Sequence, residues 1–144
     1  MTRPTAPPVL TGKRLLQAAV AILALIPVST GVTGLLFGPA GFASQPSWPT
    51  DIDSHFRFLS AIFIAIGGLF YASIPAIERK TMLFRLAALL VFAGGIGRLV
   101  SLLTVGAPTA PHLAGLGMEL VVVPLLAFWQ ARVARATPAP TSHP

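Results

Sequence analysis

The sequence predicts an all-α protein, a four-transmembrane-helix bundle with both termini in the cytoplasm. The first reason is composition, since 54% of the 144 residues are hydrophobic and only 10% are charged, whereas a soluble domain is about 25% charged. The second reason is a set of long stretches without Asp, Glu, Lys or Arg, at residues 15–50, 58–77 and 99–118. About 20 apolar residues at 1.5 Å per residue cross roughly 30 Å of hydrocarbon. A soluble helical bundle would need a polar stripe on each helix, and none is visible.

The third reason is the placement of positive charge. Lys and Arg flank the apolar stretches on one side only: Arg3, Lys13, Arg14, Arg79, Lys80, Arg85, Arg132 and Arg135. The two loops expected on the other side have none, and loops rich in Lys and Arg stay in the cytoplasm. The net charge of +6 is therefore spread over helix ends, so we expect no nucleic-acid partner. The absence of cysteine excludes disulfides and thiolate chemistry.

We expect one transmembrane domain, residues 13–135, between two disordered cytoplasmic tails at residues 1–12 and 136–144. The first span should run from Leu15 to about Phe37, with a kink at Pro27. A cleaved signal peptide is the alternative, but this apolar stretch is about twice the usual 7–15 residues.

Glycines in the first span predict close helix packing. Gly34 and Gly38 form a G-x-x-x-G pair, which lets a neighbouring helix approach closely. The pattern is common, so it does not identify the partner helix.

The second span should run from Thr50 to about Ile74 and begins with a dense group of charges. Asp51 and His55 are i, i+4 neighbours on a helix, as are Asp53 and Arg57. One interpretation is a solvated helix entrance whose charges pair locally. The other interpretation is one wall of a binding site.

The third and fourth spans are expected at Met82–Thr104 and His112–Ala131. The glycine cluster at residues 94–98 has no strand before it, so it predicts close helix packing rather than a nucleotide loop. The fourth span contains Glu119 and then Pro124.

Two of the charges within the spans are expected at the same depth. Arg98 lies thirteen residues after the cytoplasmic Arg85, and Glu119 lies thirteen before Arg132. Both should therefore sit about 20 Å from the cytoplasmic boundary. An unpaired charge there costs several kcal/mol. We therefore expect an ion pair that faces the bundle interior.

From these charges we predict an outward-facing polar pocket. Its expected lining residues are Asp51, Asp53, His55, Arg57, Arg98, Ser101, His112 and Glu119. Arg57 would be the unpaired cation for a carboxylate or phosphate, with Arg98 held by Glu119. The alternative is that the Arg98–Glu119 pair only fixes the helix register, since such contacts contribute about 1 kcal/mol.

Metal binding and hydrolysis are weaker interpretations of the same residues. His55, His112 and nearby acids could bind zinc, but the arginines oppose it, and we expect no metal or cofactor. Ser60, His55 and Asp51 could be drawn as a hydrolytic triad, but no motif supports it.

Several stretches resemble a family of small bacterial four-helix membrane proteins known as domain of unknown function 4345. They are F-G-P at 37–39, D-S-H-F-R-F-L-S at 53–60, G-G-I-G-R at 94–98, and Glu119. The resemblance covers about Leu15 to Arg132. It implies a four-helix membrane fold and carries no activity.

These observations lead to three functional hypotheses for a protein of the bacterial inner membrane. The first is a binding protein for a small amphipathic or anionic ligand. The second is an accessory subunit that packs on a membrane-protein partner or a second copy. The third is an enzyme acting on a lipid or isoprenoid, with Glu119 or His55 transferring the proton. Membrane lipid is a partner in every case.

Overall fold

The structure is a computed structural model that describes residues 8–43 and 47–137. Within these residues the regular structure is entirely helical. Four helical segments are long and apolar enough to cross a membrane, at residues 12–41, 50–76, 81–104 and 110–136. The predicted all-α fold with four membrane-spanning helices is confirmed, and the protein is of the multi-pass membrane type. The cytoplasmic location of the termini stays a prediction.

The four crossings are built from the following elements. The first consists of α1 (Pro8–Leu23), α2 (Leu25–Phe37) and a 3₁₀ turn (Gly38–Gly41). The second is α3 (Thr50–Ser73) with a 3₁₀ turn (Ile74–Ala76), and the third is α4 (Thr81–Thr104). The fourth consists of α5 (Ala110–Gly117), a π-helical turn (Met118–Val122) and α6 (Val123–Ala136). Of the predicted tails, residues 1–7 and 138–144 lie outside the described residues.

Prolines interrupt the first and fourth crossings. Pro27 has no N–H for the Leu23 carbonyl, and α1 ends at Leu23, so the helix is interrupted close to the position where a kink is predicted. Pro124 has the same effect four residues after Leu120. There the chain widens into the π turn, in which the Val123 N–H donates to the Met118 carbonyl.

Glycines bring α2 and α3 into close contact. A Cβ atom at Gly31 would lie 2.8 Å from the Ser60 carbonyl oxygen, and one at Gly34 would collide with the Ser60 hydroxyl. Only a residue without a side chain fits at these two positions. The predicted role of Gly34 in close packing is confirmed.

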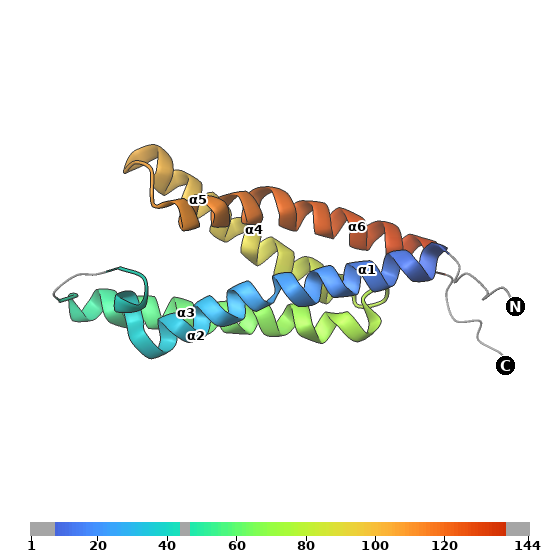
Figure 1. Ribbon diagram of the computed structural model, residues 1–144, viewed down its shortest axis with the longest axis horizontal. Helices are drawn as coiled ribbons and strands as arrows, with labels where there is room; N and C mark the ends of the chain where they lie inside the picture. Colours follow the sequence, from blue (N-terminus) through green and yellow to red (C-terminus); the bar gives the residue numbers. More distant parts are fainter. Residues whose placement is uncertain (1–7, 44–46, 138–144) are drawn as a thin grey trace, which may run out of the picture.

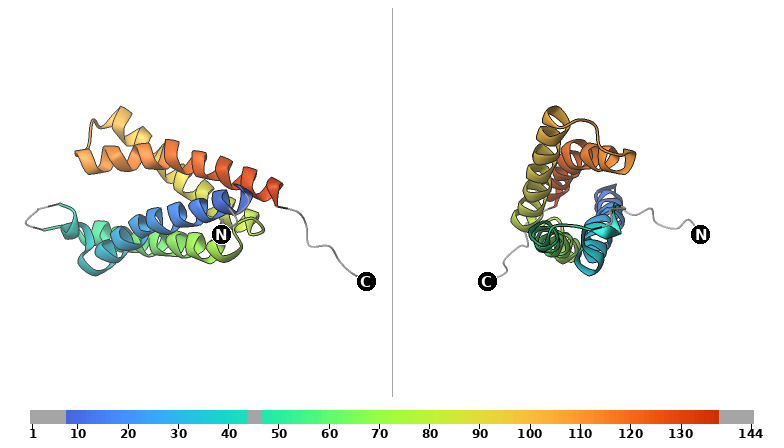
Figure 2. Two further views of the ribbon diagram at one scale, coloured as in Figure 1. Left: turned by 45° about the vertical axis from the view of Figure 1, so that its right-hand side comes forward. Right: turned by 90° about the vertical axis from the view of Figure 1, so that its left-hand side faces the viewer.

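The four crossings converge at one end and separate at the other (Figures 1 and 2). α1 packs on α6 near the chain termini, and α3 packs on α4. At the opposite end, α2 and α5 splay apart, and none of their Cα atoms come within 8 Å of each other. The bundle is therefore V-shaped, with a closed end and an open end.

The hydrophobic core lies in and near the closed end. Leu16, Ile77 and Phe84 are completely buried, and the rings of Phe70 and Phe84 meet edge to face at 5.3 Å. The side chain of Gln130 is also buried there, and its amide donates to the Ile77 carbonyl at 2.8 Å. This bond ties α6 to the turn between α3 and α4.

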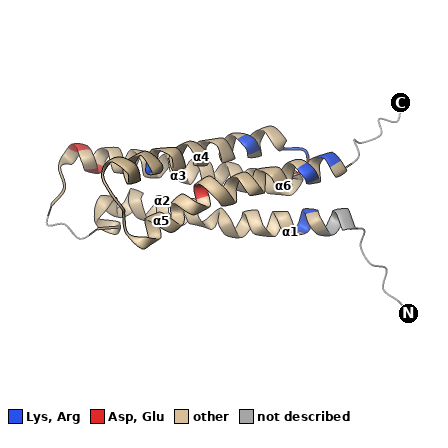
Figure 3. Ribbon diagram, turned by 90° about the horizontal axis from the view of Figure 1, so that it is seen from above, with Lys and Arg blue, Asp and Glu red and all other residues tan. Residues whose placement is uncertain are grey.

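Basic residues gather at the closed end, on α1, α4 and α6 (Figure 3). Lys13 Nζ lies 3.0 Å from Glu78 Oε2, and the Glu78 side chain is only 6% exposed. Burial raises the pKa of Glu78, but its own backbone N–H, Lys13 and Arg79 together hold that pKa below its usual value. The pair therefore links α1 to the turn that connects α3 and α4.

Candidate functional site

A cavity of about 370 Å³ lies at the base of the V, where the helices begin to separate. Every crossing contributes to its wall, which consists of Val20, Leu23, Ala24, Ile26, Pro27, Phe63, Phe70, Val91, Pro111, Ala114, Gly115, Met118, Glu119, Val123 and Leu126. All of these residues are apolar except Glu119. The cavity can therefore hold the hydrocarbon part of a ligand, with one carboxylate as its polar contact.

The fourth crossing shapes the cavity through Gly115 and the π turn. A Cβ atom at Gly115 would have no neighbour within 4 Å, so this glycine leaves space in the wall. Glu119 is carried one turn further on, within the π turn that precedes Pro124. Because such turns shift the faces of a helix relative to a regular α-helix, Pro124 helps to set the direction of the carboxylate.

Arg98 and Glu119 form the predicted ion pair, with Nε 3.1 Å from Oε2. Their side chains are 40% and 9% exposed, so the carboxylate is the buried partner. Gly95 permits this contact, because a Cβ atom there would lie 2.9 Å from the Cβ of Glu119. The packing role predicted for the glycine cluster holds at Gly95 but is wrong at Gly94 and Gly97, where a Cβ atom would have open space.

The ion pair leaves the carboxylate incompletely satisfied. Oε2 is completely enclosed and lies against Arg98, although that contact falls short of hydrogen-bond geometry. Oε1 is not enclosed in this way and accepts no hydrogen bond from the described residues. This second oxygen is therefore the one that a donor in the cavity can reach.

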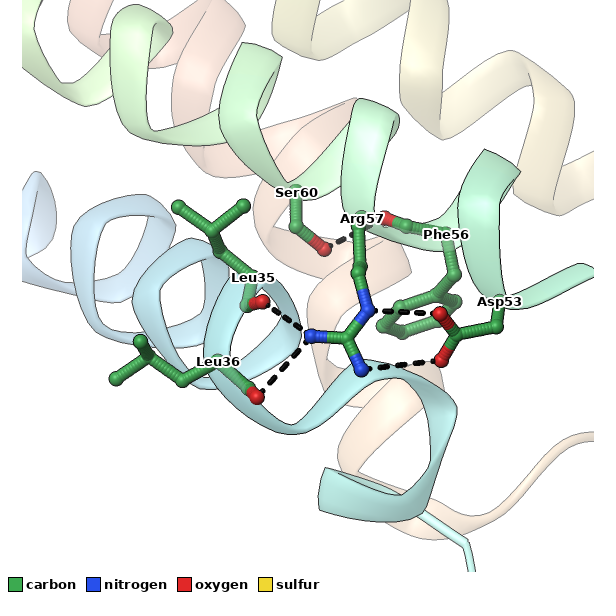
Figure 4. A network of polar contacts seen from close by, with 6 residues as sticks. All are labelled: Leu35, Leu36, Asp53, Phe56, Arg57 and Ser60. Carbon is green, nitrogen blue, oxygen red and sulfur yellow. Dashed lines mark hydrogen bonds and ion pairs between the residues drawn. The ribbon is translucent and has the colours of Figure 1, made fainter. Parts of the chain in front are cut away.

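Asp53 and Arg57 form a second polar cluster, at the open end (Figure 4). Arg57 donates from Nε and Nη2 to the two Asp53 oxygens, at 2.7 and 3.2 Å. Its Nη1 donates to the carbonyls of Leu35 and Leu36, at 2.6 and 3.1 Å. Carbonyls in the last turn of a helix have no intrahelical donor, so Arg57 caps the end of α2 from α3.

The turn after α2 closes around this cluster. Gly38 has a φ of 61°, which disfavours residues with a side chain, and a Cβ atom there would collide with the Asp53 carboxylate. The expectation that Arg57 is an unpaired cation is therefore wrong. Its charge is paired with Asp53, and its remaining donors satisfy backbone.

The other predicted pocket residues do not reach the cavity. Asp51, His55 and Ser101 are exposed and do not line it. His112 is also exposed, and its Nδ1 lies 3.0 Å from the hydroxyl of Thr109. Of the eight residues expected to form one polar pocket, only Glu119 lines the cavity, so the expected polar ring is not formed.

Metal ligands do not converge within the part of the chain that the structure describes. There, no three His, Asp or Glu side chains come close enough to hold a metal ion. His55, the other candidate for proton transfer, is outside the cavity.

Sequence reasoning missed the apolar wall and two structural amides. Gln17 donates to the Ile74 carbonyl at 2.7 Å, and Gln130 to that of Ile77. A single amide inside an apolar helix is the signal that could have identified them. No such signal exists for the wall, because residues facing a cavity and residues facing lipid have the same composition.

Comparison with known proteins gives the family of this chain. No curated protein and no solved structure shows significant similarity to it. A family match extends over residues 15–130, which includes the second and third crossings and most of the first and fourth. The chain belongs to the family described as Domain of unknown function (DUF4345).

Proposed function

We propose that this membrane protein binds a small amphipathic ligand, with the ligand's hydrocarbon in the cavity and its polar end at Glu119. The observation that carries the proposal is an apolar cavity of about 370 Å³ that contains one buried carboxylate. Pockets for small molecules typically measure about 300–1,000 Å³ and combine apolar walls with a few polar groups.

The volume limits the size of the ligand. An engineered cavity of about 150 Å³ accommodates benzene, which has six non-hydrogen atoms. By proportion, a cavity of about 370 Å³ holds about 15 non-hydrogen atoms. A single medium-length chain fits this space, whereas a whole two-chain phospholipid does not.

The ligand would enter from the membrane. Ile26 and Pro27 of α2 form one side of the cavity, and Pro111 and Ala114 of α5 form another. Since α2 and α5 do not touch, the wall between them is incomplete. With the basic closed end in the cytoplasm of a bacterial cell, this entrance faces the outer half of the inner membrane.

Native mass spectrometry of the protein in mild detergent tests the proposal. We expect a bound molecule of the stated size, and we expect Gly115→Leu to reduce its occupancy about tenfold by filling the cavity. Gly68→Leu is the matched control, because Gly68 also has open space but does not line the cavity. Equal occupancy in the two variants, or no bound molecule in any of them, would refute the proposal.

A second candidate, an accessory subunit, is favoured by the exposed glycines of α4. Gly94 and Gly97 have no neighbour within 4 Å of a Cβ position, so another helix could approach there. A subunit should co-purify with its partner in mild detergent, and Gly97→Leu should remove that partner. Purification of a stable single chain would exclude this candidate.

A further inference from the structure

Glu119 is the feature of the cavity that binding of hydrocarbon alone does not explain. The residue is 7% exposed and lies in an otherwise apolar wall. Its Oε2 is enclosed against Arg98, whereas its Oε1 is accessible and accepts no hydrogen bond from the described residues. Because a buried acceptor is stabilised when a donor reaches it, the cavity favours a ligand with an O–H or N–H group at this point.

Arg98 determines the charge that such a ligand can carry. Its guanidinium lies 3.1 Å from the Glu119 carboxylate, so the pair has no net charge. Arg98 itself does not line the cavity, and an anionic group inside would meet Glu119 first. A cationic group would compete with Arg98 for the carboxylate. Either charge would be buried without a partner of its own, which is unfavourable in an apolar site.

The geometry points to an uncharged, single-chain alcohol as the ligand, with its hydroxyl donating a hydrogen bond to Glu119 Oε1. This inference rests on the proposed function and adds the chemical class of the ligand. The hydrocarbon chain lies against the apolar wall, which includes Phe63, Val91 and Leu126. The hydroxyl remains an intact group, and no covalent step is involved.

Equilibrium dialysis of protein-containing micelles against empty micelles tests the inference with radiolabelled probes. The probes are 1-dodecanol, dodecane, dodecanoate and dodecylamine, which are of similar size and fit about 15 non-hydrogen atoms. We expect 1-dodecanol to accumulate with the protein about tenfold more strongly than dodecane, as a hydrogen bond to a charged acceptor predicts. The two charged probes should bind no better than dodecane.

Two variants of the ion pair test whether the preference for 1-dodecanol depends on an acceptor oxygen at residue 119 and on its charge. In Arg98→Leu/Glu119→Leu, which leaves no unpaired charge, the preference for 1-dodecanol should disappear while dodecane still binds. Glu119→Gln keeps an acceptor oxygen without the negative charge and should retain a preference for 1-dodecanol of less than tenfold. If the double variant fails to fold, the order of the four probes on the unmodified protein still decides the question.

The possible failures are distinguishable. If no probe accumulates above empty micelles, the proposed function itself is wrong. If dodecane and 1-dodecanol bind equally, or if dodecanoate or dodecylamine binds best, the cavity binds ligands but the inferred chemical class is wrong.

Discussion

Breaking the Arg98–Glu119 pair from either side should give unequal losses of stability. Arg98→Leu leaves the buried carboxylate of Glu119 without its cation, and removal of one partner from a buried pair destabilises by about 3–5 kcal/mol. Glu119→Leu leaves a side chain that is 40% exposed and can bend toward the membrane surface. The loss of stability in Glu119→Leu should be smaller, about 1–2 kcal/mol, because such bending lowers the cost of a charge within the membrane.

The double variant, Arg98→Leu/Glu119→Leu, should be closer to the unmodified protein than Arg98→Leu is. With neither charge left, the change reduces to one polar contact between membrane helices, which measures about 1 kcal/mol. The sum of the two single losses should therefore exceed the loss in the double variant by about 3 kcal/mol or more.

Unfolding in mixed micelles, followed by circular dichroism, provides these free energies. Ser101→Leu is the matched control, because this α4 residue is exposed and should change stability by less than about 0.5 kcal/mol. If Arg98→Leu is as stable as the control, the pair contributes nothing. If the single losses simply add, the two side chains act independently, and the reasoning from their contact fails.

Three further predictions concern packing, pH and helix capping. Gly95→Leu should destabilise by about 1–3 kcal/mol in thermal unfolding because its side chain overlaps the fourth crossing, whereas Gly94→Leu should be tolerated. Glu78, with its lowered pKa, should add stability that is complete above pH 4.5 and is lost as the pH falls through the folded-state pKa. Unfolding measured against pH should show a smaller acid loss in Lys13→Met. Arg57→Met should increase hydrogen exchange at the end of α2, and Arg57→Lys should restore little protection because lysine lacks the planar fork.

The fold and the ion pair were predictable because both follow from distance along the chain. Stretches without charge set the four crossings, and equal spacing from Arg85 and Arg132 put Arg98 and Glu119 at one depth. The cavity was not predictable. Its wall is apolar, and the sequence of an apolar membrane helix does not distinguish a side that faces lipid from a side that faces an internal space.

The charges at the start of the second crossing were interpreted as a binding site because they are dense. Arg57, however, donates two hydrogen bonds to backbone carbonyls and two to Asp53. In lipid, carbonyls at the end of a broken helix need donors from elsewhere in the protein. Arg57 supplies them to α2, and Asp53 balances its charge. Density of charge alone therefore does not separate a structural cap from a ligand site. The partners of the hydrogen bonds do separate them, because a structural cap donates to backbone carbonyls, as Arg57 does.

Glu78 and Glu119 are both buried carboxylates beside a cation, but of these two it is Glu119 that lines the cavity. Gln17 and Gln130 each satisfy a backbone carbonyl, and Arg57 satisfies the end of a helix. The Glu119 carboxylate faces Arg98 through Oε2, while its Oε1 accepts no hydrogen bond from the described residues. Leucine at this position would remove the accessible oxygen and leave Arg98 without its anion. A hydroxyl on the inferred ligand would instead complete the hydrogen bonding of this carboxylate.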